Sequence, residues 1–299
     1  MGAHLMASGT VAPVSTSSGA GTGAPHVFSY PQAEGDAAVL MYPNKQSCGA
    51  GLAKALIDAS AAAVEAKGSF TVALSGGSLV DMLPFVFRMD NKPDFSRWHV
   101  FYVDERNVAH DSPDSNHGAA KKAFLTEAGI PDSQVHAILE GADATTAARA
   151  YEGKMMNLPA NVLPKDGSGF PVLDMILLGV GPDGHVASLF PNKAATAATD
   201  GWVLPVTNSP KPPSERITMT MPVINAAKEV LVVACGKGKA EVIQRALEVQ
   251  SLPGALPVQL VRPAAGKLRY LLDLEACSEI NPELWDSAKA FPRSDIKKD

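Results

Sequence analysis

One histidine of this chain lies in a setting suited to proton transfer. The run LLGVGPDGHVASLFP covers residues 177–191 and begins with the end of an apolar stretch that predicts a buried strand. Asp183 follows this stretch, and His185 lies two residues further on. The letters VASLF predict a short helix that His185 would open. A helix N-terminus disfavours a charged imidazolium, and a neutral imidazole accepts a proton near neutral pH. A lone histidine is more often structural, yet this placement favours His185 as a general base.

A glycine-rich turn follows another predicted strand. The letters SFTVAL predict the strand, LVDMLPFVFRM predicts a helix, and four small residues join them: Ser75, Gly76, Gly77 and Ser78. Glycines let a ligand approach the backbone closely, and free N–H groups at a helix start attract anions. The turn therefore suits a phosphate group, although a tight turn without a ligand has the same letters.

Positively charged side chains lie next to two other predicted strands. DERNV places Asp104 and Arg106 where a strand ends, and an arginine can bind a phosphate or carboxylate through two hydrogen bonds. The proline-rich segment NSPKPPSER carries Lys211 and Arg216, and prolines reduce the entropy lost when a loop is held around a ligand. Taken alone, DERNV is more typical of an ordinary solvated charge cluster, whereas for the proline-rich segment binding and a solvated surface are equally compatible with the sequence.

The glycines of the histidine loop also fit a second motif. GVGPDG matches G-x-G-x-x-G, with Gly181 and Gly184 at its second and third glycines, between a strand and a predicted helix as in dinucleotide-binding proteins. The motif, however, lies past the midpoint of the chain, and the acidic residue nearest the expected offset, Asp200, does not end a strand. A dinucleotide-binding oxidoreductase is therefore the least favoured alternative.

Strands and helices alternate along the chain. Strands are predicted over residues 69–74, 98–104, 134–139, 171–181, 215–221, 229–236 and 267–274, and helices over 45–68, 79–89, 118–129, 145–157 and 237–249. Central strands that are apolar on both faces predict an α/β fold: an open, mostly parallel, Rossmann-like sheet with helices on both faces. We expect a disordered tail over residues 1–26 and a single domain over 27–299.

Parallel strands bring their carboxyl ends to one edge of a sheet, and ligands bind there in open α/β folds. The three polar segments SGGS, DERNV and GVGPDGH each follow a predicted strand directly. We therefore expect them to meet at one edge. This convergence indicates a functional site more strongly than any of the motifs does alone.

Composition narrows the classes of function and partner. The net charge of −5 disfavours a nucleic-acid-binding protein, and 46% hydrophobic residues suit a globular domain. We see no apolar run of the length that a membrane helix needs and expect no membrane partner. Three widely spaced cysteines form neither a metal-ligand pattern nor a disulfide framework, so we expect a reducing compartment, the cytoplasm.

With these residues assembled, the sequence resembles the 6-phosphogluconolactonase family, hydrolases of the pentose phosphate pathway. The resemblance extends from about Pro43 to Leu274 and rests on ALSGGS, WHVFYVDER, SNHGAAKKAFL, DMILLGVGPDGHVASLFP and PKPPSERITMTMPVINAAKEVLVVACGKGKAEVI. The segments GPDGHVASLFP and PKPPSERIT indicate this family specifically only when both are present.

The resemblance implies hydrolysis of 6-phospho-D-glucono-1,5-lactone, with His185 activating water and Asp183 orienting the imidazole or a substrate hydroxyl. It also implies that the SGGS turn, Asp104, Gly181 and Gly184 help to bind the substrate and that at least one of Arg106, Lys211 and Arg216 binds its phosphate. A lactone is an activated ester, so no metal or cofactor is expected. We expect a monomer.

Two further alternatives stay open. Hexosamine-phosphate deaminases of the same superfamily look similar in their histidine loop, but they usually carry an Asn-Glu-Pro run shortly after the histidine. This chain has Ser188, Leu189, Phe190 and Pro191 there, without a carboxylate, which favours the lactonase. A non-catalytic sensor of sugar phosphates is the other alternative, and the complete Asp183–His185 pair argues against it.

Overall fold

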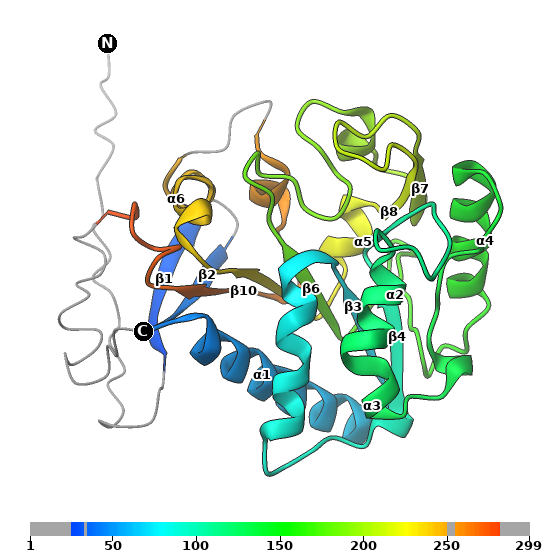
Figure 1. The fold of residues 1–299 in the computed structure, drawn as a ribbon, viewed down its shortest axis with the longest axis horizontal. Coiled ribbons are helices and arrows are strands. Elements are labelled where there is room, and N and C mark those ends of the chain that lie inside the picture. The colour runs from blue at the N-terminus through cyan, green and yellow to red at the C-terminus, as the bar shows by residue number, and fades with distance from the viewer. Residues whose placement is uncertain (1–24, 33–34, 250–254, 282–299) are drawn as a thin grey trace.

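A mostly parallel β-sheet forms the centre of the structure (Figure 1), a computed structural model that describes residues 25–32, 35–249 and 255–281. Within these residues the main sheet has seven strands in the order β1-β2-β10-β9-β6-β3-β4. Their bounds are β1 His26–Gln32, β2 Gly35–Tyr42, β3 Phe70–Leu74, β4 Trp98–Tyr102, β6 Met175–Gly179, β9 Glu229–Ala234 and β10 Lys267–Asp273. All neighbours pair in parallel except β1, which runs antiparallel to β2.

The strands separate two apolar cores because successive residues of a strand point to opposite faces. In β6, Ile176 and Leu178 belong to one core, whereas Met175 and Leu177 belong to the other. All five side chains of β3 are buried. A strand buried on both faces is typical of a parallel sheet that helices cover on each side.

Helices cover both faces, as the sequence predicted. One face carries α1 Lys45–Lys67, the 3₁₀ helix η1 Gly77–Arg88 and the continuous run α2 Asn116–Ala120, η3 Lys121–Leu125 and α3 Thr126–Ala128. The other carries α4 Ala144–Met156, α5 Met221–Asn225 and α6 Ala240–Glu248. Short 3₁₀ turns complete the described elements: η2 Phe95–Arg97, η4 Asp132–Gln134, η5 Ala194–Ala197, η6 Lys237–Lys239 and η7 Pro257–Leu260. The prediction of an α/β fold is therefore confirmed.

A second, antiparallel sheet differs from the sequence-based expectation. It has the order β5-β8-β7, formed by β5 Asp104–Arg106, β8 Arg216–Met219 and β7 Val203–Val206. The strand predicted over 98–104 thus ends at Tyr102, and the next segment pairs with β8 instead of continuing in the main sheet. The predicted strand 134–139 is reduced to one bridge between Val135 and Val100. Both changes reflect pairing between distant segments, which local sequence patterns do not encode.

Helix α1 has the length and mean hydropathy of a membrane-spanning helix, contrary to the expectation that no segment would. Its side chains explain this apolar composition. Leu52 and Leu56 are fully buried in the core beneath the sheet, and Asn44 and Gly68 cap its ends. A buried core helix can have the same length and mean hydropathy, and α1 is such a helix, since it covers one face of the sheet.

The domain boundaries stay a prediction. The tail expected over residues 1–26 lies almost entirely outside the described residues, and His26 already begins β1. Strands β1 and β2 were not predicted; their sequences, HVFSYPQ and GDAAVLMY, contain proline, glycine and aspartate, which are depleted in strands.

A buried carboxylate joins the strands at the edge opposite to the carboxyl ends of β3 and β6. Asp174 accepts hydrogen bonds from the backbone N–H of Thr71 at 2.9 Å and from its hydroxyl at 2.8 Å. It also pairs with Lys67 and Lys228 at 2.9 and 2.8 Å. Four donors around one buried side chain offset the cost of removing its charge from water.

Replacing Asp174 by alanine should therefore destabilise the fold strongly. The variant leaves two lysines and the Thr71 donors without their partner, a kind of loss that costs about 3–5 kcal/mol. Urea unfolding followed by circular dichroism would measure it. Asp58→Ala is the matched control, because Asp58 forms an exposed pair with Lys54 at 2.8 Å and its loss should cost about 0.5 kcal/mol or less. Equal effects in the two variants would contradict the role assigned to Asp174.

Candidate active site

A cavity of about 240 Å³ opens at the carboxyl ends of β3, β6 and β9. Nine of the predicted residues line it: Ser75, Gly76, Gly77, Ser78, Asp104, Arg106, Gly181, His185 and Arg216. The three polar segments thus meet at one edge of the sheet, as parallel pairing requires. Asp183, Gly184 and Lys211 are not part of the lining, but they contact residues that are.

His185 and Asp183 form a hydrogen-bonded pair. Nδ1 of His185 lies 2.5 Å from Oδ1 of Asp183. A carboxylate only accepts hydrogen bonds, so this contact places the proton on Nδ1 and leaves Nε2 unprotonated in the neutral ring. Nε2 has no hydrogen-bond partner among the described residues. The pair can therefore hold an imidazole whose free nitrogen is ready to accept a proton.

Two glycines let the loop fold back onto its own histidine. A Cβ on Gly181 would lie 2.0 Å from the Nδ1 and Cε1 atoms of His185, so only glycine fits there. Gly184 has φ +79°, a conformation that glycine adopts without strain. The N–H of Gly181 also bonds the carbonyl of His185 at 2.9 Å. These glycines position the histidine, so the partial match to a dinucleotide fingerprint has a local structural cause.

The segment after His185 is not the predicted helix. Residues 186–190 form a tight turn in which Val186 bridges to Leu189 and Ala187 has φ +49°. The Ser188 hydroxyl bonds Oδ2 of Asp104 at 2.7 Å, and this buried contact replaces a helical arrangement. A helix N-terminus therefore does not explain the state of His185, and that part of the prediction was wrong.

Burial, in place of the expected helix N-terminus, favours the neutral form of the His185 imidazole. It lowers the pKa of His185, while the bond to Asp183 and its negative charge act in the opposite direction. Burial alone would raise the pKa of Asp183, but the hydrogen bonds from His185 and Lys211 outweigh it and lower that pKa to about 2. Near neutral pH the pair is thus a carboxylate beside a neutral imidazole.

Two arginines face each other across the small sheet. Arg106 of β5 is the direct partner of Arg216 of β8 in the antiparallel register. Burial lowers the pKa of Arg216, and the charge of Arg106 lowers it further. Like charges placed directly opposite are unfavourable unless an anion lies between or beside them. The pairing therefore makes this wall of the cavity a place for a negatively charged group.

The two arginines differ in the hydrogen bonds that they already make within the protein. Arg216 donates to the carbonyls of Lys211, Pro212 and Pro213 at 2.9–3.0 Å, so it fastens the proline-rich loop. It also lies 3.9 Å from Asp104. Arg106 bonds the carbonyl of Asp114 through Nη1, and its buried Nε has no partner.

A second buried donor on the cavity wall is unpartnered as well. Ser75 is 6% exposed and its hydroxyl makes no hydrogen bond in the structure. Buried polar atoms normally find partners, and an orphaned donor in a cavity suggests a missing ligand. Ser75 and Arg106 both line the cavity, and each carries a buried donor atom without a hydrogen-bond partner.

Lys211 lies beside the histidine pair and outside the cavity lining. Its ammonium group is 3.1 Å from Oδ1 of Asp183 and 3.3 Å from Nδ1 of His185. Nδ1 of His185 is closer to Oδ1 of Asp183 than to the lysine, so the histidine and the lysine both donate to this carboxylate. This position supports a role in holding Asp183 ionised, in addition to the predicted attraction of a phosphate.

A buried glutamate that the sequence did not single out holds the arginine wall together. Glu105 is fully buried and accepts the N–H groups of Arg106, Asn116 and His117 at 2.7–2.8 Å. Burial raises its pKa to about 7 although these three bonds act to lower it. Glu105 therefore ties β5 to the start of α2.

Three lining residues with a polar side chain or thiol were not predicted as site residues. Asn116 donates to the carbonyl of Asp104 at 2.9 Å, and its side chain lies so close to Gly76 that a Cβ there would clash at 1.9 Å. Lys239 bonds the carbonyl of Val180 at 2.7 Å, and Cys235 follows β9 directly. All three lie in segments that carry the resemblance, but no local pattern assigns them a role, because they reach the cavity through tertiary contacts.

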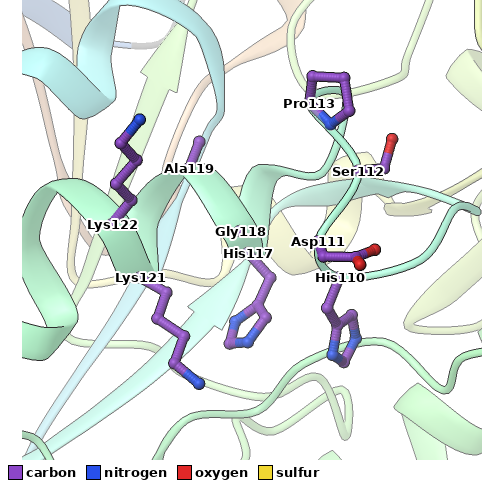
Figure 2. A pocket seen from close by; sticks show the side chains of 9 residues that line it. All are labelled: His110, Asp111, Ser112, Pro113, His117, Gly118, Ala119, Lys121 and Lys122. Atoms are coloured by element: carbon purple, nitrogen blue, oxygen red, sulfur yellow. The ribbon is translucent and has the colours of Figure 1, made fainter.

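A second cavity of about 760 Å³ lies between the loop 110–113 and the helical run that begins at α2 (Figure 2). Its two histidines are engaged by structural contacts: His110 Nε2 lies 3.0 Å from the carbonyl of Ile138, and His117 Nδ1 lies 2.9 Å from the hydroxyl of Tyr102. Lys121 and Lys122 complete its charged wall, and it shares no lining residue with the cavity of His185. Within the described residues no cluster of histidine, cysteine and carboxylate side chains could hold a metal ion.

Comparison with known sequences identifies relatives of this arrangement. The family model for glucosamine-6-phosphate isomerases/6-phosphogluconolactonase matches residues 43–270. The chain is 41% identical over 250 residues to 6-phosphogluconolactonase 3, chloroplastic, of Arabidopsis thaliana, covering 81% of this chain and 75% of that protein. It is 38% identical over 250 residues to probable 6-phosphogluconolactonase 1 of the same plant, covering 81% and 93%.

Solved structures give the same result. The 6-phosphogluconolactonase of Trypanosoma brucei aligns with a TM-score of 0.69 and 28% identity, covering 84% of this chain and all of that chain (100%). The enzyme of Leishmania guyanensis aligns with a TM-score of 0.66 and 28% identity, covering 80% and 96%.

Replacing Asp183 by asparagine should lower the pKa of His185 further. The change removes the negative charge and the hydrogen-bond acceptance that raise this pKa, while the burial that lowers it remains. Titration of the histidine Cε1 protons by NMR would show the shift. Asp111→Asn, in the second cavity, is the matched control and should leave His185 unchanged. A rise of the His185 pKa in Asp183→Asn would contradict the assigned contact.

Proposed function

The chain belongs to the glucosamine-6-phosphate isomerase/6-phosphogluconolactonase family, and from this premise we propose that it hydrolyses 6-phospho-D-glucono-1,5-lactone to 6-phospho-D-gluconate, the lactonase step of the pentose phosphate pathway. The observation that carries the proposal is the Asp183–His185 pair at 2.5 Å beside a cavity with unpartnered cationic and hydroxyl donors. The substrate is an ester ring with a phosphate at one end, so it needs both features.

His185 acts as the general base. Its unprotonated Nε2 takes a proton from a water molecule as the water oxygen attacks the lactone carbonyl carbon. Asp183 holds the Nδ1 proton and stabilises the imidazolium that forms. The tetrahedral oxyanion then collapses, the bond between the carbonyl carbon and the ring oxygen breaks, and the imidazolium returns the proton to that oxygen. The base is thereby regenerated.

The phosphate lies against the arginine wall. Arg106 offers its free Nε, and the hydroxyl of Ser75 adds a neutral donor from the SGGS turn. Charge-assisted hydrogen bonds of this kind contribute about 1.5–3 kcal/mol each. Arg216 and Lys239 add positive charge to the same wall. The guanidinium group of Arg216 is already hydrogen-bonded to the proline-rich loop. Gly76, Gly77 and Ser78 allow the substrate to approach the backbone.

The alternatives make different products. A hexosamine-phosphate deaminase would release ammonia from glucosamine 6-phosphate, whereas a sensor would bind 6-phosphogluconate without turning over the lactone. The turn 186–190 contains no carboxylate, and its polar side chain, Ser188, is buried against Asp104. This arrangement supports the lactonase over the deaminase.

Three properties remain proposals. We infer a single α/β domain over 27–299 and a monomer, and we place the protein in the cytoplasm on the basis of its free cysteines. The name of 6-phosphogluconolactonase 3 of Arabidopsis thaliana includes the word chloroplastic, whereas the name of probable 6-phosphogluconolactonase 1 of the same plant does not.

His185→Ala should fold but lose about 10²–10⁴-fold in kcat, the usual contribution of general-base catalysis. The wild-type kcat/KM should stay level into the acidic range in which an ordinary histidine is already protonated and fall only at lower pH, because burial lowers the pKa of His185 and only the neutral ring accepts a proton. Turnover of lactone generated in place, coupled to 6-phosphogluconate dehydrogenase and corrected for spontaneous opening, measures both. Near-normal kcat in a folded variant would sink the general-base role.

Arg106→Ala should raise KM for the phosphorylated lactone by about tenfold to a hundredfold, the loss of one charge-assisted hydrogen bond or two weaker ones. Turnover of unphosphorylated glucono-1,5-lactone should change little. Arg97→Ala serves as the control, because Arg97 is exposed and pairs only weakly with Asp94 at 3.6 Å. Equal losses on the two lactones would show that Arg106 does not recognise phosphate.

A further inference from the structure

Glu105 lies behind the cavity wall that Arg106 and Arg216 form, and it is fully buried without an ion pair to any described residue. Backbone donors surround it instead. Its Oε1 accepts the N–H groups of Arg106 and Asn116 at 2.7 and 2.8 Å, and its Oε2 accepts that of His117 at 2.7 Å. Burial of a carboxyl group without an ion pair costs folding free energy. A group that a fold keeps at such a cost is a candidate for a role in function.

Glu105 holds both ends of the contact that fixes the Arg106 side chain. Residues 114–117, here called the 114–117 segment, lead into α2, and Nη1 of Arg106 donates to the carbonyl of Asp114 in this segment at 2.9 Å. The backbone N–H of Arg106 bonds Glu105, and two N–H groups of the segment bond the same carboxyl group. Glu105 therefore sets the distance between the arginine backbone and the carbonyl that holds its guanidinium group.

The same carboxyl group fixes a contact with the serine–glycine turn. The side chain of Asn116 donates to the carbonyl of Asp104 at 2.9 Å, and its Oδ1 lies so close to Gly76 that a Cβ on this glycine would be 1.9 Å away. Glu105 holds the backbone N–H of Asn116 and hence the position of this side chain against the turn. One residue outside the cavity lining is thus connected to both elements that are proposed to receive the phosphate.

We propose that Glu105 is a positioning residue for phosphate recognition, whose carboxyl group holds the 114–117 segment so that the guanidinium group of Arg106 and the serine–glycine turn keep the spacing that a phosphate requires. The proposal rests on the function proposed above, because that function assigns the phosphate to these two elements. Glu105 does not line the cavity and acts through its neighbours. Loss of its contacts should weaken the binding of phosphorylated ligands and leave the chemistry at His185 almost unchanged.

The position requires a carboxyl group, because both of its oxygens must accept hydrogen bonds. Burial raises the pKa of Glu105 to about 7, and either protonation state meets the requirement. A protonated carboxyl oxygen still accepts hydrogen bonds, and its O–H can donate to the hydroxyl of Ser115, which lies 3.4 Å from Oε2. Glutamine does not meet it, since the amide nitrogen only donates and would face the N–H of His117 or those of Arg106 and Asn116.

Glu105→Gln tests the role in the full-length protein. KM for the phosphorylated lactone and Kd for 6-phosphogluconate should each rise by about tenfold, because a donor replaces one of the two accepting oxygens. The kcat on that lactone and the KM for unphosphorylated glucono-1,5-lactone should change little. A fall in kcat with unchanged KM, or equal rises of KM on the two lactones, would overturn the proposal.

Glu152→Gln is the matched control. Glu152 of α4 also accepts two backbone N–H groups, those of Trp202 and Val203 at 2.9 Å, but it lies outside the cavity lining and makes no contact with the 114–117 segment. The same substitution there should leave KM, Kd and kcat unchanged. A rise of KM for the phosphorylated lactone in Glu152→Gln equal to that in Glu105→Gln would show a general effect on folding and refute the positioning role.

A double variant determines whether the effect passes through Arg106. Glu105→Gln should raise the Kd of Arg106→Ala for 6-phosphogluconate by a much smaller factor than it raises that of the wild type, because the side chain that it displaces is already gone. An equal factor in the two backgrounds would contradict the proposal. If urea unfolding shows that Glu105→Gln does not fold, Glu105→Asp takes its place, since the shorter side chain withdraws the carboxyl group from the 114–117 segment, and the same results are expected.

An NMR measurement without ligand separates this proposal from the enzyme function. The Nε–Hε signal of Arg106, assigned by its loss in Arg106→Ala, should shift in Glu105→Gln and stay in place in Glu152→Gln. A shifted signal and a weakened Kd in protein that does not open the lactone would refute the enzyme function and leave the positioning role standing. An unshifted signal would overturn the positioning role even in an active lactonase.

Discussion

Parallel pairing of β3, β6 and β9 is the constraint on which the site depends. Because these three strands run in the same direction and adjoin one another, the loops that leave them share one edge of the sheet. The serine–glycine turn, the histidine loop and Cys235 are separated by as many as 160 positions in sequence and still line one cavity. No local feature of any single loop could assemble this set of side chains.

Three carboxylates, of which Asp104 and Glu105 are buried, then fix the positions of the charged groups around the cavity. Asp183 orients His185, Asp104 holds the turn after it through Ser188, and Glu105 ties the arginine strand to α2. Glu105, the most deeply buried of the three, accepts three backbone N–H groups, which offset the cost of its burial. The cations Arg106 and Arg216 are thus held close together, and the buried Nε of Arg106 keeps an unused hydrogen-bond donor.

Much of this arrangement could be predicted, because strand, glycine turn and histidine are adjacent in sequence. Alternation of apolar strands and helices was enough to predict the α/β fold, and the strand ends were enough to predict the shared edge. The short helix after His185 could not be judged in the same way, since the contact of Ser188 with a residue 84 positions away decides that segment. Glu105, Asn116, Lys239 and Cys235 depend on such distant contacts throughout, and no spacing rule marks them.

The carboxylate of Asp174 has a consequence for how this fold can diversify. It concentrates stabilising bonds at the edge away from the cavity, where it joins β3 and β6 to two lysines. Folding energy and chemistry are therefore assigned to opposite ends of the same strands. A substitution in a loop at the cavity edge therefore leaves untouched the anchor that joins the other ends of β3 and β6.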